Sequence, residues 1–330
     1  MQFCAWRSVR GVLAVVSKFH VERRDAKTTD RVYAYRAVPS VSRCLFPEEA
    51  PLTCEKKTSV ENLPIGLIPE QNIFRQMERY EPLGEYLSRK TGTKITFNVL
   101  RRYGNIIDSF NSSGLDGAFF GSFSYTLAHA KIGVEVLAQP VALDNTSTYY
   151  GMIFVRKDSG IRTVRDMKGK RFAFVDRATT AGYLLPLDYF HHHGISDYNH
   201  YLGETYFTGT HEDAIEDVLN MKADIGAAKN TVFQRLASED PRIMKELVVL
   251  TRSPAVPENA IALRKDIDVS VRKLLKDSLL SMHLDPDGKR VLEQFGALKF
   301  IETTDKDYDV VREYADHAHL DLSTYEYMNN

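Results

Sequence analysis

Apolar and polar positions follow two alternating patterns from about residue 62 onward. Short apolar runs, such as LPIGLIP at 63–69 and KITFNVL at 94–100, have the length and composition of buried strands. Between these two runs, residues 70–91 carry apolar side chains at helical spacing, and Gly92 is placed to end that helix. Because strands and helices alternate at short intervals, the pattern predicts parallel strands with helices on both faces of a sheet.

The same alternation begins again near residue 150. YGMIFVRKD at 150–158 and ADIGAA at 223–228 read as strands, and 182–193 reads as a helix that Gly194 ends. Three further helical stretches close the chain, at 271–282, 286–295 and 308–318. The pattern therefore predicts two α/β lobes in tandem.

The expected domain organisation has one lobe inserted into the other. Residues 61–147 and 250–330 are assigned to lobe 1 and residues 148–249 to the inserted lobe 2, with crossings near 146–150 and 249–256 acting as a hinge. An α/β lobe binds ligand outside the carboxyl ends of its strands, so two facing lobes enclose one ligand in the cleft between them.

Composition narrows the class of partner. The chain has 330 residues, with 43 Lys and Arg against 44 Asp and Glu. Such a balance gives no basic field for nucleic acid or anionic lipid, and it favours a small ligand or a protein partner. No stretch reaches the 18 or more apolar residues of a membrane span.

The first 60 residues differ from the rest of the chain. Residues 1–45 hold nine Lys and Arg and three acids without a sustained period of 2 or 3.6, which predicts a poorly ordered extension or leader. A misplaced start codon or an unusual export leader explains these residues more simply than a functional module does. All three cysteines lie in this part of the chain, and Cys54 is a poor match to a lipid-anchored cysteine because Pro51, Leu52 and Thr53 precede it.

A turn rich in small and hydroxyl residues carries the first candidate chemistry. The sequence VDRATTAGYLLP at 175–186 places Thr179, Thr180, Ala181 and Gly182 between a predicted strand and a predicted helix. A helix start exposes unpaired N–H groups and a partial positive charge, and the two hydroxyls add donors, so the turn suits an anion. The alternative is ordinary helix capping by Thr or Asp.

Two other strand ends strengthen the anion interpretation. FTGTHEDA at 207–214 places His211 at a helix start, and DIGAAKNT at 224–231 presents Lys229, Asn230 and Thr231 where a cleft is expected. Either feature alone is typical of capping or of a polar surface. Three strand ends of one lobe that offer hydroxyls, an imidazole and an ammonium predict a binding site.

The sequence resembles the substrate-binding proteins of phosphonate, phosphite and phosphate ABC importers, a family of two-lobed periplasmic receptors. The resemblance covers about residues 62–265 and rests on the motifs IGLIPEQN, EPLGEYL, KTGTKI, YGNIID, DGAFFGSFSY, FVRKDSGI, MKGKRFAFVD, TTAGYLLP, TGTHEDA and SPAVP. It implies the two-lobed, type II periplasmic binding protein fold, with two Rossmann-like lobes joined by a hinge.

The resemblance also implies roles for particular residues. The family's hydroxyl-rich oxyanion turn matches Thr179, Thr180 and Ala181, although Ala181 offers only its N–H group. The family tyrosine near the second strand matches Tyr103, and the family histidine matches His211. An aromatic residue in the turn of the third strand falls at Phe120, which lacks a phenol donor.

Departures from the family pattern suggest which ligand is preferred. Relatives that take an aminoalkylphosphonate hold its ammonium with acidic side chains, whereas the matching positions here are the neutral Thr231 and Asn259. Lys229 adds a cation nearby. Because a buried ammonium without a carboxylate is costly, we expect phosphate, phosphite or a small alkylphosphonate to be preferred.

Other functions fit the residues less well. A catalytic triad can be drawn from Thr179, His211 and an acid, but no Gly-x-Ser-x-Gly elbow or Walker loop accompanies it, so we expect no enzyme and no catalytic residues. HHHG at 191–194 predicts no metal site, because adjacent helical residues point in different directions. The Tyr149 and Tyr150 pair is expected to pack in the hinge rather than to touch ligand.

The expected partners follow from the resemblance. They are an oxyanion ligand and the permease and ATPase of an ABC importer, with no cofactor and no nucleic acid. A ligand-sensing receptor for a signalling partner is the alternative. The implied location is the periplasm or the outer face of the inner membrane, although 11–16 is short for the apolar part of a signal peptide. The residues themselves indicate no oligomeric state, and we expect a monomer.

Overall fold

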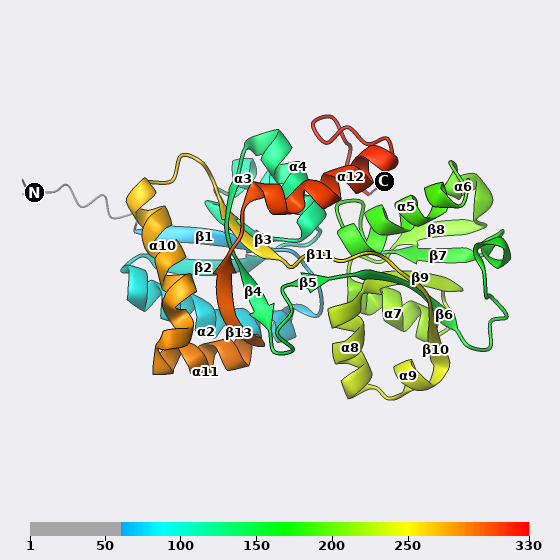
Figure 1. Ribbon diagram of the computed structural model, residues 1–330, viewed down its shortest axis with the longest axis horizontal. Helices are drawn as coiled ribbons and strands as arrows, with labels where there is room; N and C mark the ends of the chain where they lie inside the picture. The colour runs from blue at the N-terminus through cyan, green and yellow to red at the C-terminus, as the bar shows by residue number, and fades with distance from the viewer. Residues whose placement is uncertain (1–60, 330) are drawn as a thin grey trace, which may run out of the picture. The chain divides into compact units, whose positions relative to one another are not determined.

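The computed structural model describes residues 61–329, which belong to one compact unit (Figure 1). The expected N-terminal extension and the candidate anchor at Cys54 therefore lie outside the described residues. Within 61–329, no helix combines the length and the hydropathy needed to cross a membrane.

Lobe 1 is built on a six-stranded sheet with the order β13-β4-β12-β3-β1-β2 (Figure 1). Its strands are β1 (Asn62–Leu67), β2 (Lys94–Val99), β3 (Gly117–Phe120), β4 (Glu135–Ala142), β12 (Ala260–Leu263) and β13 (Ala297–Glu302). Its helices are α2 (Ile73–Thr91), α3 (Asn105–Ser112), α4 (Ser122–Ile132), α10 (Val269–Ser281), α11 (Pro286–Phe295) and α12 (Asp309–His317), with the short 3-10 turns η3 (Met282–Leu284) and η4 (Asp305–Tyr308).

Lobe 2 is built on a five-stranded sheet with the order β10-β6-β9-β7-β8. Its strands are β6 (Gly151–Arg156), β7 (Arg171–Phe174), β8 (Glu204–Phe207), β9 (Ile225–Lys229) and β10 (Leu247–Arg252). Its helices are α5 (Leu185–His192), α6 (Tyr198–Tyr201), α7 (His211–Leu219), α8 (Asn230–Glu239) and α9 (Arg242–Glu246), with the 3-10 turn η1 (Val164–Met167) and a π-helical turn, η2 (Thr180–Leu184), directly before α5.

Two short strands connect the lobes. β5 (Thr148–Tyr149) and β11 (Val256–Pro257) pair antiparallel, with Tyr149 opposite Val256. Each strand belongs to one of the two chain crossings between the large sheets. A paired ribbon of two crossings has the geometry of a hinge, because rotation about a few residues moves one lobe as a body.

Both large sheets are mixed, so the prediction of purely parallel strands was wrong. β1 pairs parallel with β2 and β3, but β12 runs antiparallel to β3 and β4. In lobe 2, β7 pairs parallel with β8 and β9, whereas β6 runs antiparallel to β9. The reason is the lobe crossing, because β6 and β12 each follow a hinge strand and enter their sheet from the cleft edge, where the parallel strands end.

Aromatic side chains fill much of the core of lobe 1. Tyr80 of α2 makes edge contacts with Phe97, Phe119 and Phe295, at ring-centre distances of 5.4, 5.3 and 5.1 Å. The helix that carries Tyr80 begins at the side-chain cap of Asn72 and ends at Gly92, which has a left-handed φ of 69°. The predicted period and the predicted stop therefore agree with α2, and the packed rings hold the cleft edge of β1 and β3 in place.

Candidate functional site

A small cavity of about 10 Å³ lies where the strand ends of both lobes meet the hinge. Its lining consists of Ile68, Glu70, Tyr103, Gly121, Tyr149, Ala178, Thr179, Thr180, Ala181, His211, Lys229 and Asn259. Contacts between the lobes enclose it, since the Phe123 N–H of α4 donates to Thr180 Oγ1 at 2.8 Å. In this arrangement the cavity has room for about one water molecule, so a larger group fits only when the lobes move apart.

The threonine turn contributes backbone donors to the cavity. The first π-type bond runs from Leu184 N to the Thr179 carbonyl at 3.1 Å, so the N–H groups from Thr180 to Tyr183 precede the internal hydrogen bonds of the turn. Gly182 permits the turn to pack on the end of β7, because a Cβ there would lie 2.4 Å from the Val175 side chain. The turn therefore presents free donors next to the two threonine hydroxyls.

The two threonine hydroxyls have different roles in this arrangement. Thr180 Oγ1 accepts the Phe123 N–H, which leaves the hydroxyl proton of Thr180 available. Thr179 Oγ1 instead donates to the Asp176 carbonyl at 2.6 Å. Both threonines were expected to donate to the ligand, and the structure shows that the Thr179 proton is already used to shape the turn.

Two tyrosines bring phenol groups to the cavity. Within residues 61–329, the buried Tyr103 hydroxyl has no hydrogen-bond partner, and burial raises the pKa of Tyr103. Tyr149 Oη lies 3.3 Å from Ser122 Oγ, and burial raises the pKa of Tyr149 as well. Because Ser122 gives its one hydroxyl proton to the Pro257 carbonyl at 2.5 Å, the Tyr149 proton is shared with Ser122 Oγ. Both phenols therefore stay protonated at neutral pH, and that of Tyr103 has a proton free to donate.

His211 is a neutral donor. Burial lowers the pKa of His211 from 6.5 to about 3, against the opposing charge of Glu70. Its Nδ1 accepts the Lys229 backbone N–H at 3.4 Å, which places the imidazole proton on Nε2. Position 211 is the first residue of α7, whose cap is the Thr210 side chain, so the ring lies at a helix start as the sequence predicted.

The Lys229 ammonium is enclosed by oxygen atoms of the protein itself. Nζ lies 3.1 Å from Glu70 Oε1 and 3.2 Å from Asn259 Oδ1. It also donates to Glu258 Oε1, and it sits 4.4 Å from the centre of the Tyr149 ring. These groups are named here the lysine cage: Lys229, Glu70, Glu258, Asn259 and Tyr149.

The lysine cage corrects the expected electrostatics of the site. Lys229 was expected to place a cation near the ligand, and the structure shows that two carboxylates pair with it. The two acids raise the pKa of Lys229 despite its burial, and the pKa of Glu70 is lowered to about 2 by Lys229 although burial opposes this. One ammonium and two carboxylates sum to one negative charge, so the cage adds no net positive charge to the cavity.

A larger cavity of about 370 Å³ lies on the other side of the cage. Its lining includes Arg79, Arg235 and Glu258. Glu70, Lys229 and Asn259 line both cavities. These three residues therefore form the wall that separates the small cavity from the larger one.

The structure brings most of the expected site residues together. Those that line the small cavity are Tyr103, Thr179, Thr180, Ala181, His211, Lys229 and Asn259. Phe120 lies outside this lining, buried and stacked on Phe110 at 5.9 Å. Asn230 also lies outside it, because its Oδ1 accepts the Tyr150 N–H in the hinge, and Thr231 lines the larger cavity.

Two cage residues were missed by the reasoning from sequence. Glu70 lies three positions after the end of β1, so its position near a strand end was a usable signal. Glu258 adjoins Asn259 in the second crossing, where no pattern in the sequence marks its contact with Lys229. For Tyr149, hinge packing was favoured over ligand contact, and the residue pairs in the hinge and also lines the cavity.

Known binding proteins of transporters are similar in sequence to this chain. A family model described as "ABC transporter, phosphonate, periplasmic substrate-binding protein" matches residues 65–308. The phosphonates-binding periplasmic protein of Escherichia coli is 27% identical over 287 residues, which cover 86% of this chain and 82% of that protein. The probable phosphite-binding protein PhnD1 of Prochlorococcus marinus is 23% identical, over 76% of this chain and 88% of that protein. The phosphate-import protein PhnD of Mycolicibacterium smegmatis is 23% identical, over 78% of this chain and 85% of that protein.

Solved structures share the fold. A binding component of a phosphonate transporter from Pseudomonas aeruginosa superimposes with a TM-score of 0.73 at 23% identity, over 79% of this chain and 87% of that one. PhnD1 of Prochlorococcus marinus in complex with methylphosphonate gives a TM-score of 0.71 at 21% identity, over 79% of this chain and 99% of that one. These likenesses confirm the predicted two-lobed α/β fold.

The buried neutral histidine predicts a pH dependence of stability. Between pH 7.5 and 5 the unfolded chain protonates His211 near pH 6.5, whereas the folded chain does not until about pH 3. The contribution of His211 to the free energy of unfolding therefore falls by about 2 kcal/mol as the pH drops from 7.5 to 5. Urea unfolding of the wild type and of His211→Gln at both pH values measures the difference, and equal pH slopes for the two proteins would contradict a neutral His211.

Proposed function

The chain belongs to the family of periplasmic substrate-binding proteins of phosphonate ABC transporters, and from this premise we propose that its ligand is a compact phosphorus oxyanion without an ammonium group. Phosphate, phosphite and small alkylphosphonates meet this description. The protein holds the ligand in the small cavity between the lobes and delivers it to the permease when the lobes separate at the hinge strands.

The donors of the small cavity support an oxyanion. Thr180 and Tyr103 each have a hydroxyl proton free to donate, and His211 has Nε2–H. The backbone N–H group of Ala181, which lines the cavity, adds a donor at the start of the turn. A tetrahedral oxyanion accepts several hydrogen bonds at once, and hydrogen bonds to a charged acceptor are the strong ones.

The lysine cage is the observation that carries the choice of ligand. The Lys229 side chain occupies the position next to the oxyanion donors. There its ammonium group pairs with the carboxylates of Glu70 and Glu258. A ligand ammonium in this place would repel Lys229 and would find both acids already paired. The same side chain closes the way to the larger cavity, so a long substituent on phosphorus is also excluded.

Names of relatives agree with this choice. Two are named for phosphite and phosphate, and one solved relative contains methylphosphonate. All three ligands are compact and lack an ammonium group. The neutral donors described above are suited to the tetrahedral oxygens that these ligands share.

A panel of ligands tests the proposal directly. Calorimetric titration of the purified chain with phosphate, phosphite, methylphosphonate and 2-aminoethylphosphonate is expected to show binding of one or more of the first three. The aminoalkyl compound is expected to bind at least about tenfold more weakly than the best of them, a difference of about 1.4 kcal/mol. Preferential binding of 2-aminoethylphosphonate would refute the choice of ligand, and no binding of any compound would refute the oxyanion itself.

Single donors are expected to contribute measurably. Thr180→Ala and Tyr103→Phe each remove a hydroxyl proton aimed at the cavity, so each is expected to weaken oxyanion binding by about 1 to 3 kcal/mol. Thr208→Ala is the matched control, because its hydroxyl bonds to the Phe174 and Thr210 carbonyls outside the cavity lining. Titration of the three variants measures the effect, and a loss of affinity in Thr208→Ala as large as in Thr180→Ala would count against the assigned donors.

Removal of the lysine is expected to change the ligand preference. In Lys229→Met the carboxylates of Glu70 and Glu258 lose their partner and the wall between the cavities opens. Stability is expected to fall by about 3 to 5 kcal/mol, because one member of a buried ion pair is lost. We expect 2-aminoethylphosphonate to bind this variant at least about tenfold more tightly than the wild type, since its ammonium replaces that of the lysine.

The control for this change removes the carboxylate charges as well. The triple variant Lys229→Met, Glu70→Gln and Glu258→Gln has the same opened wall but no anionic cage. It is expected to show no gain for 2-aminoethylphosphonate over methylphosphonate, and thermal melting with and without ligand verifies that each variant is folded. If Lys229→Met is folded, binds methylphosphonate and gains nothing for the aminoalkyl compound, the assigned role of Lys229 is wrong.

A further inference from the structure

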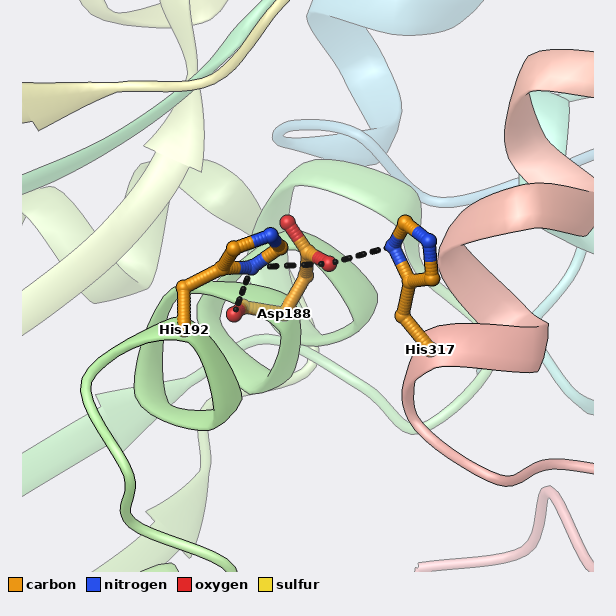
Figure 2. A group of neighbouring side chains, drawn as sticks. All are labelled: Asp188, His192 and His317. Atoms are coloured by element: carbon orange, nitrogen blue, oxygen red, sulfur yellow. Dashed lines mark hydrogen bonds and ion pairs between the residues drawn. The ribbon is translucent and has the colours of Figure 1, made fainter.

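A second group of polar side chains lies away from the oxyanion cavity, between α5 and α12 (Figure 2). Asp188 and His192 are one turn apart on α5, and His317 is the last residue of α12. Asp188 Oδ1 lies 3.3 Å from His192 Nδ1 and 3.1 Å from His317 Nδ1. All three ligand atoms lie within 4.8 Å of one another, so tertiary folding brings together two imidazoles and a carboxylate from distant parts of the chain.

Further histidines gather at the same place. His192 faces His317 with ring centres 5.7 Å apart, and His191 faces His319 at 5.5 Å. Four of the ten histidines of the chain therefore meet where the ends of these two helices adjoin. Such a concentration of metal-binding side chains is a separate observation from the geometry of the three.

Access and charge are suitable for an ion. The side chains of His192 and His317 are 58% and 50% exposed, whereas that of Asp188 is 13% exposed. Within residues 61–329, the ion pairs of Asp188 are formed with these two histidines and not with a lysine or an arginine. The carboxylate is therefore mostly buried, and the side chains that pair with it in the described part of the chain are these two imidazoles.

The ligand set and its spacing point to a transition metal. Two imidazoles with one carboxylate are typical of zinc and its neighbours, and not of magnesium or calcium, which prefer oxygen ligands. Bonds of about 2.0 to 2.1 Å in a tetrahedral site place neighbouring ligand atoms about 3.3 to 3.4 Å apart. The two distances to Asp188 Oδ1, 3.3 and 3.1 Å, are close to this spacing.

We propose that Asp188, His192 and His317 form a binding site for a divalent transition-metal ion such as Zn²⁺. The ion replaces the proton that His192 Nδ1 shares with the Asp188 carbonyl at 2.8 Å, and it leaves at least one coordination position for water. His192 is the one member of the histidine run at 191–193 that joins the site.

The position of the site gives the ion a structural effect. α5 continues the threonine turn of lobe 2, and α12 contacts both α5 and α4, the latter a helix of lobe 1. The three ligands also line a cavity of about 310 Å³ whose other walls include Gly151 and Ser253 beside the hinge strands. An ion at this site fastens α12 to lobe 2 and stabilises the arrangement of the lobes described here.

Metal titration tests the site without any oxyanion. Zn²⁺ is titrated by calorimetry into the full, untagged chain in phosphate-free buffer, with Cys4, Cys44 and Cys54 blocked by alkylation. Co²⁺ absorption reports the coordination geometry. We expect one ion per chain, tetrahedral Co²⁺ bands and a rise in melting temperature with Zn²⁺.

Variants decide which residues hold the ion. His192→Ala and His317→Ala are each expected to weaken Zn²⁺ binding more than about tenfold, the lower limit for loss of a group that supports a metal site. The matched control is His193→Ala, because its Nδ1 bonds to the Tyr189 carbonyl and its ring lies on Tyr189, away from the three ligands. Affinity for Zn²⁺ is expected to be unchanged in that variant.

Several outcomes would overturn the proposal. One is the absence of saturable Zn²⁺ binding at one ion per chain. Another is a loss of Zn²⁺ affinity in His193→Ala equal to that in His192→Ala. A third is unchanged Zn²⁺ affinity in His317→Ala, which would assign the ion to the exposed histidine run alone. A cooperative thermal melt without metal shows that His192→Ala and His317→Ala fold, and because the readout is metal affinity, failure here is distinct from failure of the proposed function.

Discussion

The burial of one ammonium group governs the arrangement of the site. Lys229 ends β9 of lobe 2, and its charge is almost fully removed from water. Such a burial is costly unless oxygen atoms replace the water, and here they come from lobe 1 through Glu70 and from the hinge crossing through Glu258. These ion pairs therefore stabilise one arrangement of the two lobes. The Lys229 side chain also separates the small cavity from the large one.

Around this ion pair, the oxyanion donors come from ordinary features of an α/β fold. The threonine turn lies at a strand end and His211 at a helix start. Neither of these donors carries a charge. Under the proposed function, the site distinguishes ligands by shape and by the absence of an ammonium group in the ligand, and not by net attraction.

Several parts of this site were predictable from local sequence. Thr180, Ala181 and His211 stand at strand-to-helix turns, where unpaired N–H groups and short polar side chains favour an anion, and all three line the cavity. Local pattern was misleading for Phe120 and Asn230, because each sits at a strand end but turns its side chain toward a packing partner, Phe110 or the Tyr150 amide. Periodicity reports which face of an element is buried, but not which neighbour covers it.

By itself, the sequence determined the two α/β lobes, the helix that ends at Gly92 and the threonine turn, because hydrophobic period and turn chemistry are local properties. Strand direction was decided by tertiary structure, since β6 and β12 enter their sheets after crossing between the lobes. Tertiary structure also decided the charge of the site, because Glu70 and Lys229 are 159 positions apart in the sequence. Contacts across such distances depend on how the lobes meet, and no local pattern in the chain encodes them.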